Sequence, residues 1–142
     1  MRSITENAET TTSESGSLDI VVPYTTKELT RLAMRRAEAL SAEIRSRIRI
    51  VRLQRVPFPL ELQQSPIAVD VLREQTQQVA LGMPAAEILI FLTRDPADTL
   101  LKTLRPGSIL VIASKKRWWR TAQERLQRFC ARNGHEVAIV YA

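Results

Sequence analysis

The side chains with the clearest capacity for chemistry follow an apolar run that begins at Ser108. Where the run ends, a hydroxyl, three cations and two indole rings come in succession: Ser114, Lys115, Lys116, Arg117, Trp118 and Trp119. Ligands of open α/β sheets bind beyond the ends of buried strands, and a helix N-terminus with cationic side chains suits an anion. The stretch is therefore a candidate nucleotide or anion site, with a tryptophan as the stacking surface.

Three other interpretations of this stretch remain open. The cations could be solvated while a tryptophan packs the last helix against the sheet or a dimer partner. The cluster could instead dock a partner protein, because Trp and Arg are common at interfaces. Basic residues interleaved with aromatic ones also suit a nucleic-acid backbone. Because the cations are spread over several segments and no nucleic-acid-binding motif is present, nucleic acid is not an expected partner.

Catalytic chemistry finds little support in the sequence. His135 is the only histidine and Cys130 the only cysteine, and neither has a carboxylate pair or metal-ligand spacing near it. One cysteine excludes an intramolecular disulfide and suggests either a reducing compartment or simply a buried thiol. Asp95 and Asp98 fit the first turn of a helix, where carboxylates complement the dipole. We expect neither an enzyme nor a metal site.

Length and charge predict one basic domain with an acidic tail. The chain has 142 residues, of which 44% are hydrophobic, and a formal net charge of +6. Residues 1–17 hold Arg2 against Glu6, Glu9 and Glu14 and are rich in Ser and Thr, so they predict a disordered tail before a domain at 18–142. No apolar run is long enough for a membrane span, and no signal peptide is present, so a cytoplasmic protein is expected.

The rest of the chain alternates between strand and helix patterns. Apolar, β-branched runs predict strands at residues 18–24, 47–56 and 86–93, in the run from Ser108, and at 136–141. Helices are predicted from a Thr25–Glu28 capping box, from Ser65 and Pro66 to Gly82, from Asp95 to Leu104, and over residues 118–133 before a left-handed Gly134. Alternating βα units predict a three-layer α/β/α sandwich around a five-stranded parallel sheet.

The second predicted strand is unusual for its arginines, at positions 45, 47, 49, 52 and 55. A strand packed on both faces cannot bury them all, so we expect their long side chains to extend past the sheet edges and ends. An anion-binding row of arginines is the alternative.

Four segments together resemble the universal stress protein family. VVPYTTKELTRLAMRRAEAL is similar to that family's first strand and helix, and VRLQRVPFP to its second strand and proline turn. TRDPADTLL resembles its G-D-P-A-E segment, and ILVIASKKR lies where the family has the end of its fourth strand. The resemblance spans residues 18–142 in the expected order.

The resemblance implies a Rossmann-like sheet of strand order 3-2-1-4-5 and a homodimer formed through the last strand, 136–141. It also implies a nucleotide cleft between the first and fourth strands, where the switch-point rule independently places a ligand. In this sequence the cleft would be lined by Tyr24, Thr25, Thr26, Lys115 and Lys116.

The glycine pattern of the ATP-binding members is missing from this sequence. After the fourth strand those members carry a glycine, two residues, a glycine, nine residues, and then glycine with Ser or Thr. Here Ala113 and Lys116 replace the first two glycines, and no third precedes Gly134. Thr25 and Arg94 replace a family acidic residue and another family glycine. We therefore expect a non-catalytic regulatory or stress-response module without conventional ATP binding, or alternatively a nucleotide- or anion-binding protein.

Overall fold

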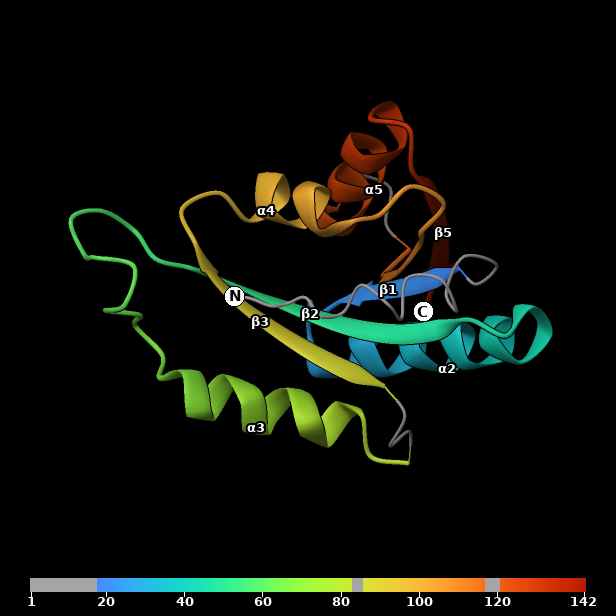
Figure 1. Cartoon of the computed structure of the whole chain (residues 1–142), viewed down its shortest axis with the longest axis horizontal. Coiled ribbons are helices and arrows are strands. Elements are labelled where there is room, and N and C mark those ends of the chain that lie inside the picture. The colour runs from blue at the N-terminus through green and yellow to red at the C-terminus, as the bar shows by residue number, and fades with distance from the viewer. Residues whose placement is uncertain (1–17, 83–85, 117–120) are drawn as a thin grey trace, which may run out of the picture.

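The computed structural model describes residues 18–82, 86–116 and 121–142. In that part of the chain, strands and helices alternate strictly (Figure 1). The elements are β1 (Asp19–Pro23), α2 (Lys27–Ile44), β2 (Arg47–Arg55), α3 (Val69–Val79), β3 (Glu87–Thr93), α4 (Pro96–Thr103), β4 (Ile109–Ser114), α5 (Ala122–Arg132) and β5 (Glu136–Tyr141). The predicted tail, residues 1–17, lies outside the described residues.

The five strands form one all-parallel sheet in the order β3-β2-β1-β4-β5. This confirms the predicted strand order. β1 pairs with β2 on one side and with β4 on the other, where Ile20 lies opposite Ile109. The order of the strands reverses at β1, so a switch point lies between β1 and β4, at the carboxyl ends of these two strands.

Helices cover both faces of the sheet, with α2 and α3 on one side and α4 and α5 on the other (Figure 1). Alternate residues of β1 therefore enter different cores: Ile20 and Val22 pack under α2, and Val21 packs toward α4 and α5. Every residue of β1 and β4 is buried. These two continuous apolar runs form the centre of the three-layer sandwich, as the sequence predicts.

Two helix starts differ from the prediction. The N-cap of α2 is Thr26, whose hydroxyl accepts a hydrogen bond from the Leu29 amide, and not Thr25. The helix α3 begins at Val69, after an Ala68 cap with no side-chain hydrogen bond. Ser65 instead forms a local turn with the backbone of Ile67. The predicted Ser65 cap is therefore wrong, because this serine satisfies groups in the loop before the helix.

The start of α5 also differs from the prediction, and its end agrees with it. The helix begins at Ala122 rather than near residue 118, because Thr121 is its N-cap and forms a capping box with Glu124. At the other end, Gly134 has a φ of +89°, which confirms the predicted left-handed residue. The Gly134 amide donates to the carbonyl of Ala131, and the His135 amide donates to that of Cys130.

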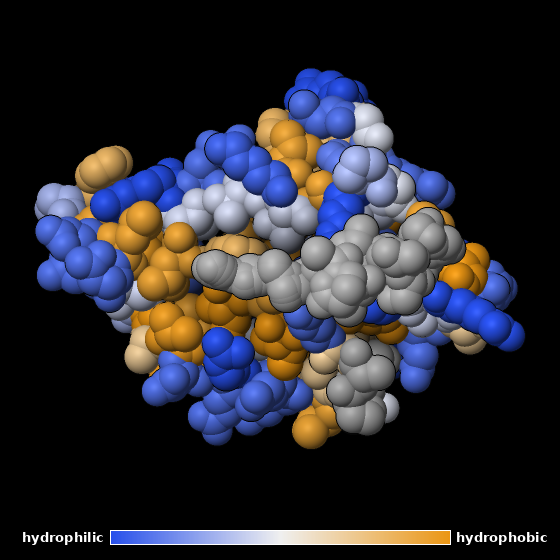
Figure 2. Space-filling model, viewed as in Figure 1, coloured by the Kyte–Doolittle hydropathy of each residue, from blue (hydrophilic) through white to orange (hydrophobic). Residues whose placement is uncertain are grey.

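The β3 edge carries an apolar surface. Figure 2 shows hydrophobic colour over β3, between the more hydrophilic surfaces of α4 and α3. Most residues of β3 are half-buried, although its sequence EILIFLT is almost entirely apolar. In the part of the chain between β2 and β3, the side chains of Phe58, Val71 and Leu81 are exposed. Val71 therefore lies on the exposed side of α3, and Leu72, Thr76 and Val79 form the buried side of this helix.

Candidate functional site: the carboxyl edge of β1 and β4

The predicted site residues leave the sheet from two neighbouring strands. Tyr24, Thr25 and Thr26 follow the end of β1, and Lys115 and Lys116 follow the end of β4. Because β1 and β4 are paired and parallel, their carboxyl ends lie at the same edge of the sheet. The fold therefore brings the two predicted segments to one edge. Arg117, Trp118 and Trp119 lie outside the described residues.

Tyr24 lies under a cation from the next strand. The Arg52 guanidinium carbon is 3.9 Å from the centre of the Tyr24 ring, a distance at which the ring quadrupole attracts the cation. The Tyr24 amide donates to the carbonyl of Val51 at 2.9 Å. Within the described part of the chain, the buried Nη1 of Arg52 has no hydrogen-bond acceptor. Sequence reasoning left the role of Arg52 open, because it did not pair this residue with Tyr24, the aromatic residue that follows β1.

The two threonines after β1 serve the start of α2. The Thr26 hydroxyl caps the helix, and the Thr25 amide donates to the hydroxyl of the buried Thr30 at 3.0 Å. These hydrogen bonds satisfy backbone donors that would otherwise lack partners at a helix start. The predicted binding role of Thr25 and Thr26 is not tested by this geometry, although the Thr25 amide and the Thr26 hydroxyl already have structural partners.

Ser114 is buried where β4 meets the α5 cap. Its side-chain oxygen lies 2.7 Å from that of Thr121. Its carbonyl accepts a hydrogen bond from the Ala142 amide at 2.9 Å. The last residue of β4 therefore joins the N-terminus of α5 to the end of β5, and its side chain is held inside the protein.

The first turn of α5 is closed by a carboxylate of the chain itself. One oxygen of Glu124 accepts from the Thr121 amide at 2.9 Å, and the Thr121 hydroxyl accepts from the Glu124 amide at 3.1 Å. The other carboxylate oxygen accepts from the Tyr141 hydroxyl at 2.8 Å. This last hydrogen bond raises the pKa of the Tyr141 phenol above its ordinary value of 10.0. The Glu124 carboxylate therefore occupies the N-terminal end of α5, where the helix dipole would otherwise favour a bound anion.

Comparison with solved structures decides which known fold these elements form. A universal stress protein in complex with cAMP aligns with 89% of this chain and 98% of its own, at 21% sequence identity and a TM-score of 0.59. A universal stress protein from Archaeoglobus fulgidus aligns with 92% of this chain and 98% of its own, at 12% identity and a TM-score of 0.64. The chain has the universal stress protein fold. No protein-family model and no curated protein matches its sequence.

Six residues, 115–120, lie between Ser114 and the α5 cap Thr121 in the sequence. The T-x-x-E spacing of Thr121 and Glu124 is the sequence signal that locates the true start of the helix.

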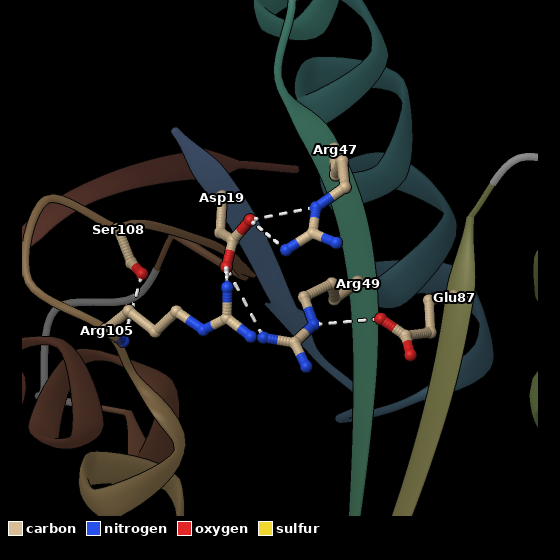
Figure 3. Close-up of polar contacts among 6 residues, drawn as sticks. All are labelled: Asp19, Arg47, Arg49, Glu87, Arg105 and Ser108. Carbon is tan, nitrogen blue, oxygen red and sulfur yellow. Dashed lines mark hydrogen bonds and ion pairs between the residues drawn. The ribbon is translucent and has the colours of Figure 1, made fainter. Parts of the chain in front are cut away.

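A second polar cluster lies at the opposite edge of the sheet, where the strands begin (Figure 3). Arg47 donates to Oδ1 of the buried Asp19 from Nη2 at 3.1 Å and from Nε at 3.3 Å. Arg49 and Arg105 approach Oδ2 at 3.4 Å and 3.7 Å, and Arg49 also pairs with Glu87 at 3.0 Å. Two members of the predicted arginine row, Arg47 and Arg49, therefore neutralise a carboxylate of the same protein. Sequence reasoning missed Asp19, which it treated as an ordinary strand residue.

The chain's other reactive groups lie apart from the carboxyl edge of β1 and β4. Among the described residues, no three His, Cys, Asp or Glu side chains are grouped so that they could hold a metal ion. Cys130 is fully buried on α5 against β4, and His135 lies just before β5 begins. In the ranges 18–82, 86–116 and 121–142, no helix has both the length and the apolar character needed to cross a bilayer.

The free energy of unfolding is expected to depend on the ionisation of Cys130 at alkaline pH. Burial raises the pKa of its thiol above the ordinary 9.0. Above pH 9.0 the unfolded chain releases this proton while the folded protein keeps it, so stability falls until the pH passes the folded-state pKa. Urea denaturation from pH 8 upward, compared with a Cys130→Ala variant, isolates this contribution. Parallel pH profiles for the two proteins would contradict the assignment.

Proposed function

We propose that the chain is a non-catalytic regulatory module of the stress-response type, which does not hold ATP as the glycine-patterned universal stress proteins do. The observation that carries this proposal is the closed first turn of α5. Thr121 and Glu124 already pair with each other's amides there, and Tyr141 donates to the same carboxylate.

Electrostatics favours this proposal over ATP held at the helix terminus. A phosphate at a helix N-terminus needs backbone N–H donors and gains from the dipole. Here the phosphate would meet the Glu124 carboxylate and would have to replace hydrogen bonds already made at 2.9 Å and 3.1 Å. Close approach of backbone to phosphate is easiest at glycine, whereas this edge presents Ala113 and Lys116.

The reactive side chains support a non-catalytic role. A cysteine nucleophile acts as a thiolate in a partly exposed, electropositive setting. Cys130 is instead fully buried, and desolvation raises its pKa. The Ser114 hydroxyl is buried and paired with that of Thr121. The chemistry of these groups fits a binding or scaffolding role.

A second candidate function is nucleotide or anion binding at the same edge. The specific observation is positive charge beside an aromatic ring: Lys115 and Lys116 are exposed after β4, and Arg52 stacks on Tyr24 with a buried nitrogen that lacks an acceptor in the described structure. A neighbour of the same fold was solved in complex with cAMP. A small phosphate ester is therefore the ligand class to test first.

We further propose that the domain spans residues 18–142, acts in the cytoplasm, and forms a homodimer through β5. Of the described strands, only β4 pairs with β5, and the EVAIVY sequence of β5 is β-branched and mostly half-buried. Such an edge offers unpaired backbone groups to a second strand. Light scattering at high micromolar concentration tests the dimer, which a monomeric mass would exclude.

Isothermal titration with ATP, ADP, AMP and cyclic nucleotides distinguishes the two candidates. We expect no saturable heat with ATP for the unmodified chain. A Glu124→Gln variant keeps a hydrogen-bond acceptor but removes the charge, so it should show any anion affinity that the carboxylate suppresses. Saturable binding to the unmodified protein that disappears in Lys115→Ala/Lys116→Ala would overturn the first proposal and establish the second.

A further inference from the structure

Strand β3 forms one edge of the sheet and has few of the features that usually protect an edge strand. Among the described strands it pairs with β2 alone, and its seven residues, Glu87–Thr93, stay in register with Arg49–Arg55. The pairing therefore contains no β-bulge. No charged residue and no proline interrupts the apolar run from Ile88 to Leu92. A long apolar edge of this kind is a template for another strand.

The hydrogen bonds to β2 show which backbone groups of β3 are left over. The Val56 amide donates to the Thr93 carbonyl at 2.9 Å, so the backbone groups of Thr93 face β2. In a parallel pair, the backbone groups of successive residues point alternately toward the neighbouring strand and away from it. Those of Ile88, Ile90 and Leu92 therefore point away from β2, and in the described part of the chain they have no hydrogen-bond partner.

The sequence of β3 is self-complementary when two copies run antiparallel. With a two-fold axis through Ile90, Ile88 of each copy lies opposite Leu92 of the other. Leu89 lies opposite Phe91 in the same way. Every residue with outward backbone groups then meets another such residue, and each of these opposed pairs exchanges two hydrogen bonds. The large apolar side chains that become cross-strand neighbours stabilise the pairing further.

The charges at the two ends of β3 favour the same arrangement. Glu87 begins the strand with a side chain that is 53% exposed, and Arg94 follows its last residue. An antiparallel copy brings the Glu87 end of each chain to the Arg94 end of the other, whereas a parallel copy would place like charges together. A second copy of this chain therefore matches the edge in both its charge and its apolar pattern.

We propose that the β3 edge binds a second copy of the chain by antiparallel pairing centred on Ile90. The contact continues the sheet from one copy into the next. It is separate from the β5 contact proposed above and does not depend on it, because β3 and β5 lie at opposite edges of the sheet (Figure 1). With both edges in use, copies would join edge to edge into an open chain.

Proline substitutions at the two edges test the two contacts separately. Ile139 on β5 is the counterpart of Ile90. The Ala142 amide donates to the Ser114 carbonyl, so the Ile139 N–H points away from β4. Proline at either isoleucine removes an outward N–H and no hydrogen bond of the sheet itself. An Ile139→Pro chain should still associate through β3, and sedimentation equilibrium should show association at least about tenfold weaker when Ile90→Pro is added.

Two results of this experiment would overturn the β3 contact. An Ile139→Pro chain that is folded by circular dichroism and monomeric at high micromolar concentration would exclude it, while leaving the β5 dimer as the explanation of any association of the unmodified chain. Undiminished association of the variant that carries both prolines would also exclude it.

Hydrogen exchange tests the contact in the unmodified chain and does not require a variant to fold. The amides of Ile88, Ile90 and Leu92 should exchange about tenfold more slowly at high than at low micromolar protein concentration. Those of Leu89 and Phe91 face β2 and should be protected equally at both concentrations. Exchange of the outward amides that does not depend on protein concentration would overturn the proposal.

Discussion

Replacing Asp19 by alanine is expected to lower the free energy of unfolding by about 3 kcal/mol. The substitution removes a buried carboxylate and leaves the guanidinium groups of Arg47, Arg49 and Arg105 facing one another. Losing one partner of a buried ion pair costs more than the pair contributes, because the Arg49 guanidinium, whose side chain is only 13% exposed, stays largely desolvated. Urea denaturation monitored by circular dichroism measures the change.

Glu87→Ala is the matched control for this prediction. Glu87 pairs with Arg49 in the same cluster, but its side chain is 53% exposed. Removing it should cost no more than about 1 kcal/mol, because exposed ion pairs are weak. Equal effects of the two substitutions would show that burial of Asp19 does not determine its importance. An Asp19→Ala protein with an unchanged urea midpoint would contradict the prediction outright.

Replacing Leu100 by alanine is expected to cost about 3 kcal/mol through the cavity it leaves. Leu100 is completely buried and is the only buried residue of the short helix α4. It packs in the same core as Val21, Val51 and Leu110. Without it, α4 loses its main contact with the sheet. Thermal denaturation should show a lower melting temperature with the native circular dichroism spectrum retained.

Leu81→Ala separates the cavity effect from the loss of leucine itself. The Leu81 side chain is 76% exposed, so its truncation should change the free energy of unfolding by less than about 0.5 kcal/mol. If Leu100→Ala behaved like Leu81→Ala, α4 would not be anchored through this core.

The overall architecture could be predicted because the central strands have a simple hydrophobic pattern in the sequence. β1 and β4 are buried on both faces, and they appear in the sequence as unbroken apolar runs bounded by proline and polar residues. The helix starts were harder to locate. Thr25 and Thr26 are both competent caps one residue apart, and Ser65 satisfies loop groups before α3 begins. Such local choices depend on which backbone groups the fold leaves without partners.

The candidate site was predictable in place but not in detail. The switch-point rule locates the edge where Tyr24 and Lys115 emerge. The closure of that edge depends on Ser114, Thr121 and Tyr141, which come together only when β4, α5 and β5 pack. The convergence of Arg47, Arg49 and Arg105 on Asp19 likewise requires the pairing of β1 with β2 and the loop before β4. The spacing of residues in the sequence does not by itself predict these contacts between distant side chains.

The central position of β1 also has a consequence for biosynthesis. β1 leaves the ribosome before the other strands of this sheet, yet one of its two neighbours is β4, which includes residues 109–114. Until that strand emerges, the side of β1 that will pair with β4 has unpaired backbone groups and apolar neighbours. Nascent chains that stop before Ser114 should therefore engage chaperones, and completion of the sheet should follow the synthesis of β4 and β5.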